Sequence, residues 1–160
     1  MISVMFVCHG NICRSPMAEF ILKDLTAKRG LAKEFVIASS ATSSEEIYGG
    51  IGNPIYPPAA RELARRGVPY EMRRATRLQK SDYMRYDWFL CMDHNNMRNM
   101  QAIFGGDPLS KCRLLKSFTK EGGQVADPWY SGDFSQAFDD IYKGCTAFLE
   151  EILSNEGAKK

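Results

Sequence analysis

Long apolar runs and a strong excess of either charge are absent from this sequence of 160 residues. No run approaches the roughly 20 apolar residues that a membrane-spanning helix requires, and the apolar run at 2–7 is too short for a secretory signal. Basic and acidic residues number 21 and 19, so the formal net charge is only +2. That balance gives no reason to expect nucleic acid or a membrane as a partner. We therefore expect a cytoplasmic protein.

Histidine is scarce, and the cysteines show no repeated spacing. The two histidines form no cluster with carboxylates, and the five cysteines are an odd number. Neither a disulfide framework nor a metal site is indicated, and we expect no cofactor. Cys91, Cys112 and Cys145 lie in apolar runs, and we expect them to be buried thiols of the core.

Short apolar runs alternate with runs of helical periodicity. Strands are expected at 2–7, 35–38, 87–92 and 112–115, helices at 15–30, 58–66, 93–104 and 134–153, and a further short helix at 76–85. This alternation predicts an α/β fold with a small twisted parallel sheet of four strands and helices on both faces. Residues 1–155 are expected to form a single domain, and 156–160 a flexible tail.

The segment from Cys8 to Ser15 joins the first strand to the first helix. Ser15 followed by Pro16 is typical of a helix start with Ser15 as the N-cap, and a helix N-terminus favours anions. Gly10 and Asn11 tolerate left-handed backbone angles, which lets successive N–H groups converge on one anion. Phosphate is therefore the expected ligand. The expected phosphate-binding residues are His9, Gly10, Asn11, Ile12, Cys13, Arg14 and Ser15.

Cys8 and Arg14 are the candidates for chemistry in this segment. The donors that bind phosphate also favour a thiolate at Cys8, which faces the phosphorus. The planar fork of Arg14 can bind two phosphate oxygens, and more strongly as charge spreads over them in the transition state. Ser15 can donate a hydrogen bond to the Cys8 sulfur and stabilise it as a leaving group.

Residues 7–19, Val-Cys-x-Gly-Asn-Ile-Cys-Arg-Ser-Pro-Met-Ala-Glu, resemble the phosphate loop of the low-molecular-weight protein tyrosine phosphatases. The resemblance implies metal-independent hydrolysis of phosphotyrosine in a protein or peptide, through a phosphocysteine on Cys8, with inorganic phosphate as product. It also implies that Cys13 traps oxidised Cys8 as a disulfide. The residues alone leave open that Cys13 serves only packing.

A second segment, Asp127-Pro128-Trp129-Tyr130, lies in a loop flanked by glycines. Two aromatic residues in such a loop indicate that they line a binding site, although a capped turn also fits this pattern. The resemblance implies that Asp127 is the general acid and then the general base, and that Trp129 and Tyr130 form a substrate wall.

The polar stretch after the second strand lies where open α/β sheets bind ligands, so it is a further candidate wall. Family members often have an aromatic residue there, whereas this chain has Glu45 in a longer loop. Tyr48 or Tyr56 could take the place of that aromatic residue. His9 also departs from the family's usual uncharged residue. It is either a neutral residue at the pocket mouth or, when protonated, a group that attracts phosphate.

Family members support the loop asparagine through two serines and a histidine. Asn11, Ser15 and Ser39 match the first three of these positions, whereas Arg73 lies near the place of the histidine. The support of the loop is therefore expected to differ in detail.

Two other functions remain open on the sequence. An arsenate reductase of the same fold needs further redox cysteines at close spacing, and it leaves Asp127 unexplained. A phosphotyrosine-binding module without catalysis has no need of Cys8, Arg14 and Asp127 together. The expected function is therefore a cysteine-dependent tyrosine phosphatase that is a monomer or a weak dimer.

Overall fold

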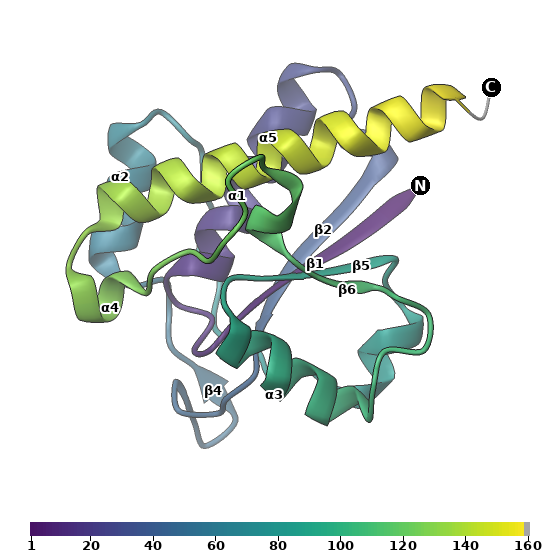
Figure 1. The fold of residues 1–160 in the computed structure, drawn as a ribbon. Helices are drawn as coiled ribbons and strands as arrows, with labels where there is room; N and C mark the ends of the chain where they lie inside the picture. Colours follow the sequence, from purple (N-terminus) through teal and green to yellow (C-terminus); the bar gives the residue numbers. More distant parts are fainter. Residues whose placement is uncertain (159–160) are drawn as a thin grey trace.

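The computed structural model describes residues 1–158, with side chains through residue 155. Its centre is a four-stranded parallel sheet in the order β2-β1-β5-β6 (Figure 1). The strands are β1 (Ile2–Cys8), β2 (Phe35–Ala41), β5 (Trp88–Cys91) and β6 (Cys112–Leu114). The predicted α/β class, the four parallel strands and their approximate positions are confirmed.

Helices cover both faces of the sheet (Figure 1). They are α1 (Arg14–Lys28), α2 (Pro57–Arg65), α3 (His94–Phe104), α4 (Pro128–Ser131) and α5 (Phe134–Ala158), with 3₁₀ turns η1 (Ala32–Glu34), η2 (Lys80–Met84) and η3 (Leu115–Phe118). Alternate residues of β1 point to opposite faces, as the strand period of two requires. Val4 and Phe6 pack with α1, α2 and α5, whereas Met5 and Val7 pack with α3 and η2.

The segment between β2 and α2 contains a small antiparallel hairpin that the sequence did not predict. Its strands are β3 (Ile47–Tyr48) and β4 (Ile51–Gly52). Gly52 packs closely on the following segment, because an added Cβ would lie 1.9 Å from the carbonyl oxygen of Ala75. The hairpin is therefore fixed against the segment around Ala75, and its Ile47 packs with Ile12 and Cys13 of the loop that follows β1.

Three predicted boundaries need correction. The first helix begins at Arg14 with Cys13 as its N-cap, so Ser15 is not the cap; its hydroxyl is bonded to other groups of the loop. The helix expected at 76–85 is only the 3₁₀ turn η2. The last helix continues beyond 153 to Ala158 and includes part of the expected tail, while residues 159–160 lie outside the described residues.

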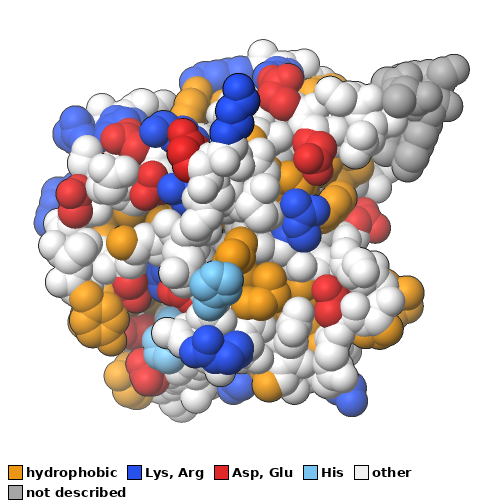
Figure 2. Space-filling view, viewed as in Figure 1, with side chains coloured by type: hydrophobic (Ala, Val, Ile, Leu, Met, Phe, Trp, Pro, Cys, Tyr) orange, Lys and Arg blue, Asp and Glu red, His pale blue; other side chains and the backbone are white. Residues whose placement is uncertain are grey.

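Charged side chains of both signs are interspersed over the face that Figure 2 shows, in keeping with the small net charge. Among the residues that the structure describes, no helix is long and apolar enough to cross a membrane.

Candidate active site

The loop after β1 turns at Asn11, the one loop residue with a left-handed backbone (φ 59°). It leads from Cys8, the last residue of the central strand β1, to the N-terminus of α1. A strand end and a helix N-terminus thus meet here, as the sequence predicted. This arrangement directs unpaired N–H groups of the first helical turn toward one anion.

Cys8 is 3% exposed, and its Sγ lies 3.0 Å from the Oγ of Ser15. The amide Nδ2 of Asn11 donates to the Ser15 Oγ at 2.8 Å and to the Ser39 Oγ at 2.9 Å. The three expected support residues therefore meet beneath the loop, and Asn11 and Ser15 are fully buried.

Arg73 also contacts this network, in place of the histidine of the resembled family. Its guanidinium donates to the main-chain carbonyl of Asn11 at 2.7 Å and to the Asn11 Oδ1. The backbone N–H of Thr76 donates to the same Oδ1 at 3.0 Å. The sequence placed Arg73 near this position but gave no sign of the role of Thr76, because the contact is long-range.

Arg14 is 2% exposed and is held by three acceptors from distant parts of the chain. Its Nη1 donates to Asp93 Oδ2 at 2.7 Å and to the carbonyl of Val125 at 2.8 Å, and its Nη2 donates to Asp127 Oδ2 at 3.3 Å. Burial alone lowers the pKa of Arg14, but the negative charges of Cys8, Asp127 and Asp93 outweigh it, so the net pKa is raised. Arg14 therefore stays charged and oriented. Its partner Asp93 was predicted only as a helix cap.

Asp127 caps the short helix α4 and also contacts Arg14 at the start of α1. Its Oδ1 accepts from the N–H of Trp129 at 3.1 Å, while its Oδ2 faces Arg14. The segment is therefore a capped turn, as one of the two sequence readings expected, and the same aspartate also faces Arg14. Trp129 packs on Tyr56, with ring centroids 4.8 Å apart, and Tyr130 is 85% exposed.

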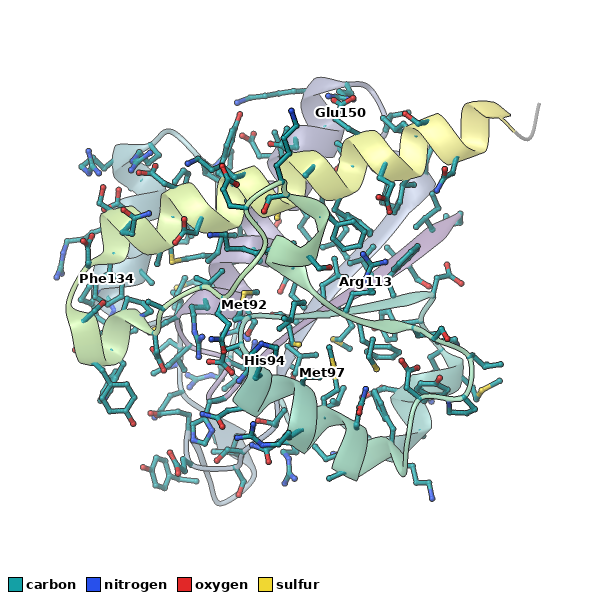
Figure 3. All side chains as sticks on the ribbon, in the orientation of Figure 1. Met92, His94, Met97, Arg113, Phe134 and Glu150 are labelled. Atoms are coloured by element: carbon teal, nitrogen blue, oxygen red, sulfur yellow. The ribbon has the colours of Figure 1, made fainter. Side chains whose placement is uncertain are left out.

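Phe134 extends this aromatic group from the start of α5, which Figure 3 places beside α4. Its ring centroid lies 6.0 Å from that of Tyr56. Tyr56, which the sequence offered as an alternative wall residue, thus packs against Trp129 and Phe134 and does not line the pocket.

A single pocket unites most of the predicted site. It is lined by Cys8, His9, Gly10, Ile12, Cys13, Arg14, Glu45, Glu46, Asp127, Trp129 and Tyr130. The structure does not bring Tyr48 to the pocket, since it lies in β3, does not line the cavity and is 67% exposed. Glu46 was not predicted; it is fixed by a hydrogen bond from Asn53 at 2.6 Å.

His9 lies at the mouth of the pocket. Its Nε2 is 2.9 Å from the Oε2 of Glu45, and both side chains are largely exposed. The imidazole therefore contacts a carboxylate from the segment between β2 and β3, which neither sequence reading of His9 included.

Cys13 lines the pocket beside Cys8 and is 6% exposed. Burial, together with the negative charges of Cys8 and Asp127, raises the pKa of the Cys13 thiol far above its ordinary value. Cys13 is therefore protonated at neutral pH. The remaining cysteines, Cys91, Cys112 and Cys145, are buried as expected. In the part of the chain that the structure describes, no cluster of histidine, cysteine and carboxylate side chains is arranged to hold a metal ion.

Comparison with known proteins decides the family. The model of the low molecular weight phosphotyrosine protein phosphatases matches residues 3–158. The chain belongs to this family. Its relatives include the low molecular weight protein-tyrosine-phosphatase YfkJ of Bacillus subtilis, 34% identical over 154 residues, covering 95% of this chain and 96% of that protein. The human low molecular weight phosphotyrosine protein phosphatase is 33% identical and covers 93% and 94%.

Solved phosphatases of this family share the fold. The crystal structure of YfkJ superposes with a TM-score of 0.90 and covers 97% of this chain and 96% of that one. SP-PTP from Streptococcus pyogenes, 34% identical, has a TM-score of 0.84 and covers 99% and 98%. The predicted family and the predicted enzyme class, a protein tyrosine phosphatase, are thus confirmed.

Proposed function

We propose that this phosphatase hydrolyses phosphotyrosine in a protein or peptide through a phosphocysteine on Cys8. The observation that carries the proposal is the meeting of Cys8, Arg14 and Asp127 in one pocket. The pocket lining comes from three separate stretches of sequence, 8–14, 45–46 and 127–130. Cys8, Arg14 and Asp127 each have the chemical type that their step requires. The expected location is the cytoplasm.

In the first step, the Cys8 thiolate attacks phosphorus in line with the tyrosine oxygen. The P–S bond forms as the P–O bond breaks, and Asp127, as the acid, gives its proton to the leaving phenolate. The loop N–H groups and Arg14 stabilise the charge on the transferred phosphoryl oxygens.

In the second step, Asp127 has lost its proton and acts as the base. It takes a proton from a water molecule that attacks phosphorus, and the P–S bond breaks to return the Cys8 thiolate and inorganic phosphate. The contact of Ser15 with the sulfur supports this step, because a hydroxyl donor stabilises a leaving thiolate.

The pocket chemistry favours an aryl phosphate. Ile12 and Trp129 offer apolar and aromatic surface beside the phosphate loop. The short side chain of phosphoserine does not reach such a wall, and a phenolate is a better leaving group than an alkoxide (tyrosine pKa about 10).

The test is hydrolysis of p-nitrophenyl phosphate in EDTA under mildly acidic conditions. Wild type should turn over and be inhibited by vanadate, while Cys8→Ser should be inactive. Cys112→Ser, the same substitution at a cysteine outside the pocket, should retain activity. A wild-type chain that binds phosphate but does not hydrolyse the ester would be only a receptor for phosphotyrosine. Thiol oxidation that depends on arsenate would indicate a reductase.

We also propose that Cys13 protects Cys8 from irreversible oxidation. Peroxide converts the more reactive Cys8 to a sulfenic acid, and the Cys13 thiol displaces water from it to form a disulfide. Mass mapping after peroxide should show a Cys8–Cys13 disulfide that dithiothreitol reverses. In Cys13→Ser, the same dose should give sulfinic or sulfonic acid at Cys8. Sulfonated Cys8 in wild type, with Cys13 untouched, would exclude protection.

A further inference from the structure

Glu45 enters the pocket from the segment between β2 and β3, and contacts with the phosphate loop fix its position. The N–H of Ser43 donates to the carbonyl of His9 at 3.0 Å, and the N–H of Glu45 donates to the Ser43 Oγ at 3.0 Å. The Glu45 carboxylate lies 2.9 Å from the Nε2 of His9. The backbone and the side chain of His9 therefore both hold this segment, and Glu45 lines the pocket that contains Cys8.

The next residue, Glu46, adds a second carboxylate to the pocket lining. Its carboxylate accepts from the side-chain amide of Asn53 at 2.6 Å, and a Cβ added at Gly10 would lie 3.2 Å from its Cγ. An amide carries no charge, so Asn53 holds this carboxylate without neutralising it. Two carboxylates thus lie beside one imidazole, and their summed charge is negative whether or not the imidazole is protonated.

The pocket lining supplies no cation to balance these two carboxylates. Arg14 is the one lysine or arginine among the described residues that line the pocket, and it is 2% exposed and already faces Asp93 and Asp127. None of the ion pairs found among the described side chains joins Glu45 or Glu46 to a lysine or an arginine. The Glu45 side chain is 71% exposed, so a cation from outside the chain can reach it.

We propose that Glu45 is a specificity-determining residue, which binds a lysine or an arginine next to the phosphotyrosine of the substrate. The inference rests on the proposed function, because it concerns the peptide that carries the phosphate ester. When the phosphotyrosine side chain occupies the pocket, its neighbours in the peptide lie at the mouth, where a long basic side chain can reach the Glu45 carboxylate. An acidic neighbour is repelled by the same charge, so Glu45 selects by attraction and by repulsion.

The position of Glu45 gives this charge its significance for the substrate. It lies where family members often have an aromatic residue, so this part of the pocket offers a carboxylate in place of a ring. An aromatic residue there contacts the phosphotyrosine ring and does not distinguish between the charges of its neighbours. A carboxylate does make that distinction, and its effect falls as salt screens the exposed charges.

The first test compares kcat/KM for two phosphotyrosine peptides that differ only in the residues on either side of phosphotyrosine, lysine in one and glutamate in the other. Wild type should prefer the lysine peptide by about fivefold or more, the upper range for an exposed ion pair, since glutamate replaces attraction by repulsion. The preference should shrink as the ionic strength rises. Equal values of kcat/KM for the two peptides would overturn the proposal.

Variants of Glu45 test whether this side chain causes the preference. Glu45→Gln should lower the ratio of the two kcat/KM values severalfold, and Glu45→Lys should lower it further. Glu45→Asp, which keeps the charge on a shorter side chain, should retain part of the preference. Glu71→Gln removes an exposed carboxylate outside this pocket and should keep the wild-type ratio. A ratio that Glu45→Lys leaves unchanged would refute the role of Glu45.

A binding measurement separates this inference from the proposed function. Cys8→Ser cannot form the phosphocysteine, so calorimetry can measure its affinity for both peptides without turnover. If wild type hydrolyses neither peptide while Cys8→Ser binds the lysine peptide more tightly, the proposed function is refuted and the role of Glu45 is supported. Hydrolysis of both peptides with equal kcat/KM refutes only the role of Glu45.

Discussion

Asp127 has one partner in the free enzyme, Arg14, and a second in the proposed reaction, the leaving oxygen of the substrate. In the free enzyme its carboxylate pairs with Arg14 at 3.3 Å. In the proposed reaction, the phosphate dianion of the substrate competes for the same guanidinium and releases the carboxyl group for proton transfer to the leaving oxygen. The proposed general acid is thus also a counter-ion of Arg14.

Asp127→Asn keeps the shape of this side chain and removes its proton-transfer capacity. We expect turnover of phenyl phosphate, which has a poor leaving group, to fall by about 10²-fold or more, the usual range for general acid catalysis. With p-nitrophenyl phosphate, the rate of the first step, formation of the phosphocysteine, should fall much less, because the nitrophenolate leaves without protonation. Steady-state and burst kinetics on both esters make the comparison. Equal losses in the first step would remove Asp127 as the acid.

Asp93 both orients Arg14 and caps helix α3, because its two oxygens have different partners. Oδ1 accepts from the N–H of Asn96 at 2.8 Å and caps α3, and Oδ2 accepts from Arg14 at 2.7 Å. Asp93→Asn and Asp93→Ala should both raise the KM for aryl phosphates, since both release Arg14. Only the alanine loses the cap, so it should be less stable than the asparagine by about 1 kcal/mol in urea unfolding. Equal stabilities would show that the cap contributes nothing.

At the element scale, the β3–β4 hairpin carries one wall of the pocket and depends on one close contact. A Cβ at Gly52 would meet backbone atoms of Ala75, which cannot move aside as a side chain can. We expect Gly52→Ala to lower the free energy of unfolding by about 1–3 kcal/mol, the range for overpacked sites. The pocket should widen as Glu46 moves, with a higher KM for aryl phosphates. Urea unfolding and kinetics measure both effects.

Ile51→Ala is the matched control, because Ile51 lies in the same strand with 62% of its surface exposed. It should change stability by less than about 0.5 kcal/mol. A Gly52→Ala variant that behaves like this control would show that the hairpin tolerates displacement.

The elements differ in how well the sequence predicts them. The sheet strands are short, mainly apolar runs, with β-branched residues in β1 and β2, and Asp93 marks the start of α3, so local patterns located them. Strands of two residues, such as β3 and β4, have no periodicity to detect. The phosphate loop was predictable because all its residues are contiguous. The partners of Arg14 and Asn11, at Asp93, Val125 and Thr76, come from distant segments that only the folded chain brings together.

In the whole molecule, Asp107 links the 3₁₀ turn η2 to the start of β6, on the face of the sheet that α3 covers. Its carboxylate accepts from the Tyr83 hydroxyl at 2.6 Å and from the N–H groups of Lys111 at 2.8 Å and Cys112 at 3.0 Å. Burial raises the pKa of Asp107, but these hydrogen bonds outweigh it, so the net pKa is lowered. The ionised group therefore stabilises the fold.

The sign of the pH dependence follows from this lowered pKa. The contribution of Asp107 is complete above the pKa of an unfolded aspartate, about 3.9, and is lost as the pH falls through the lower value of the folded state. Asp107→Asn should cost about 2 kcal/mol at neutral pH, the range of charge-assisted hydrogen bonds. Its difference from wild type should stay constant down to about pH 5 and shrink below about pH 4. Glu71→Gln, which neutralises an exposed carboxylate, should show no such convergence in urea unfolding. A difference that is the same at every pH would mean that Asp107 contributes by shape and not by charge.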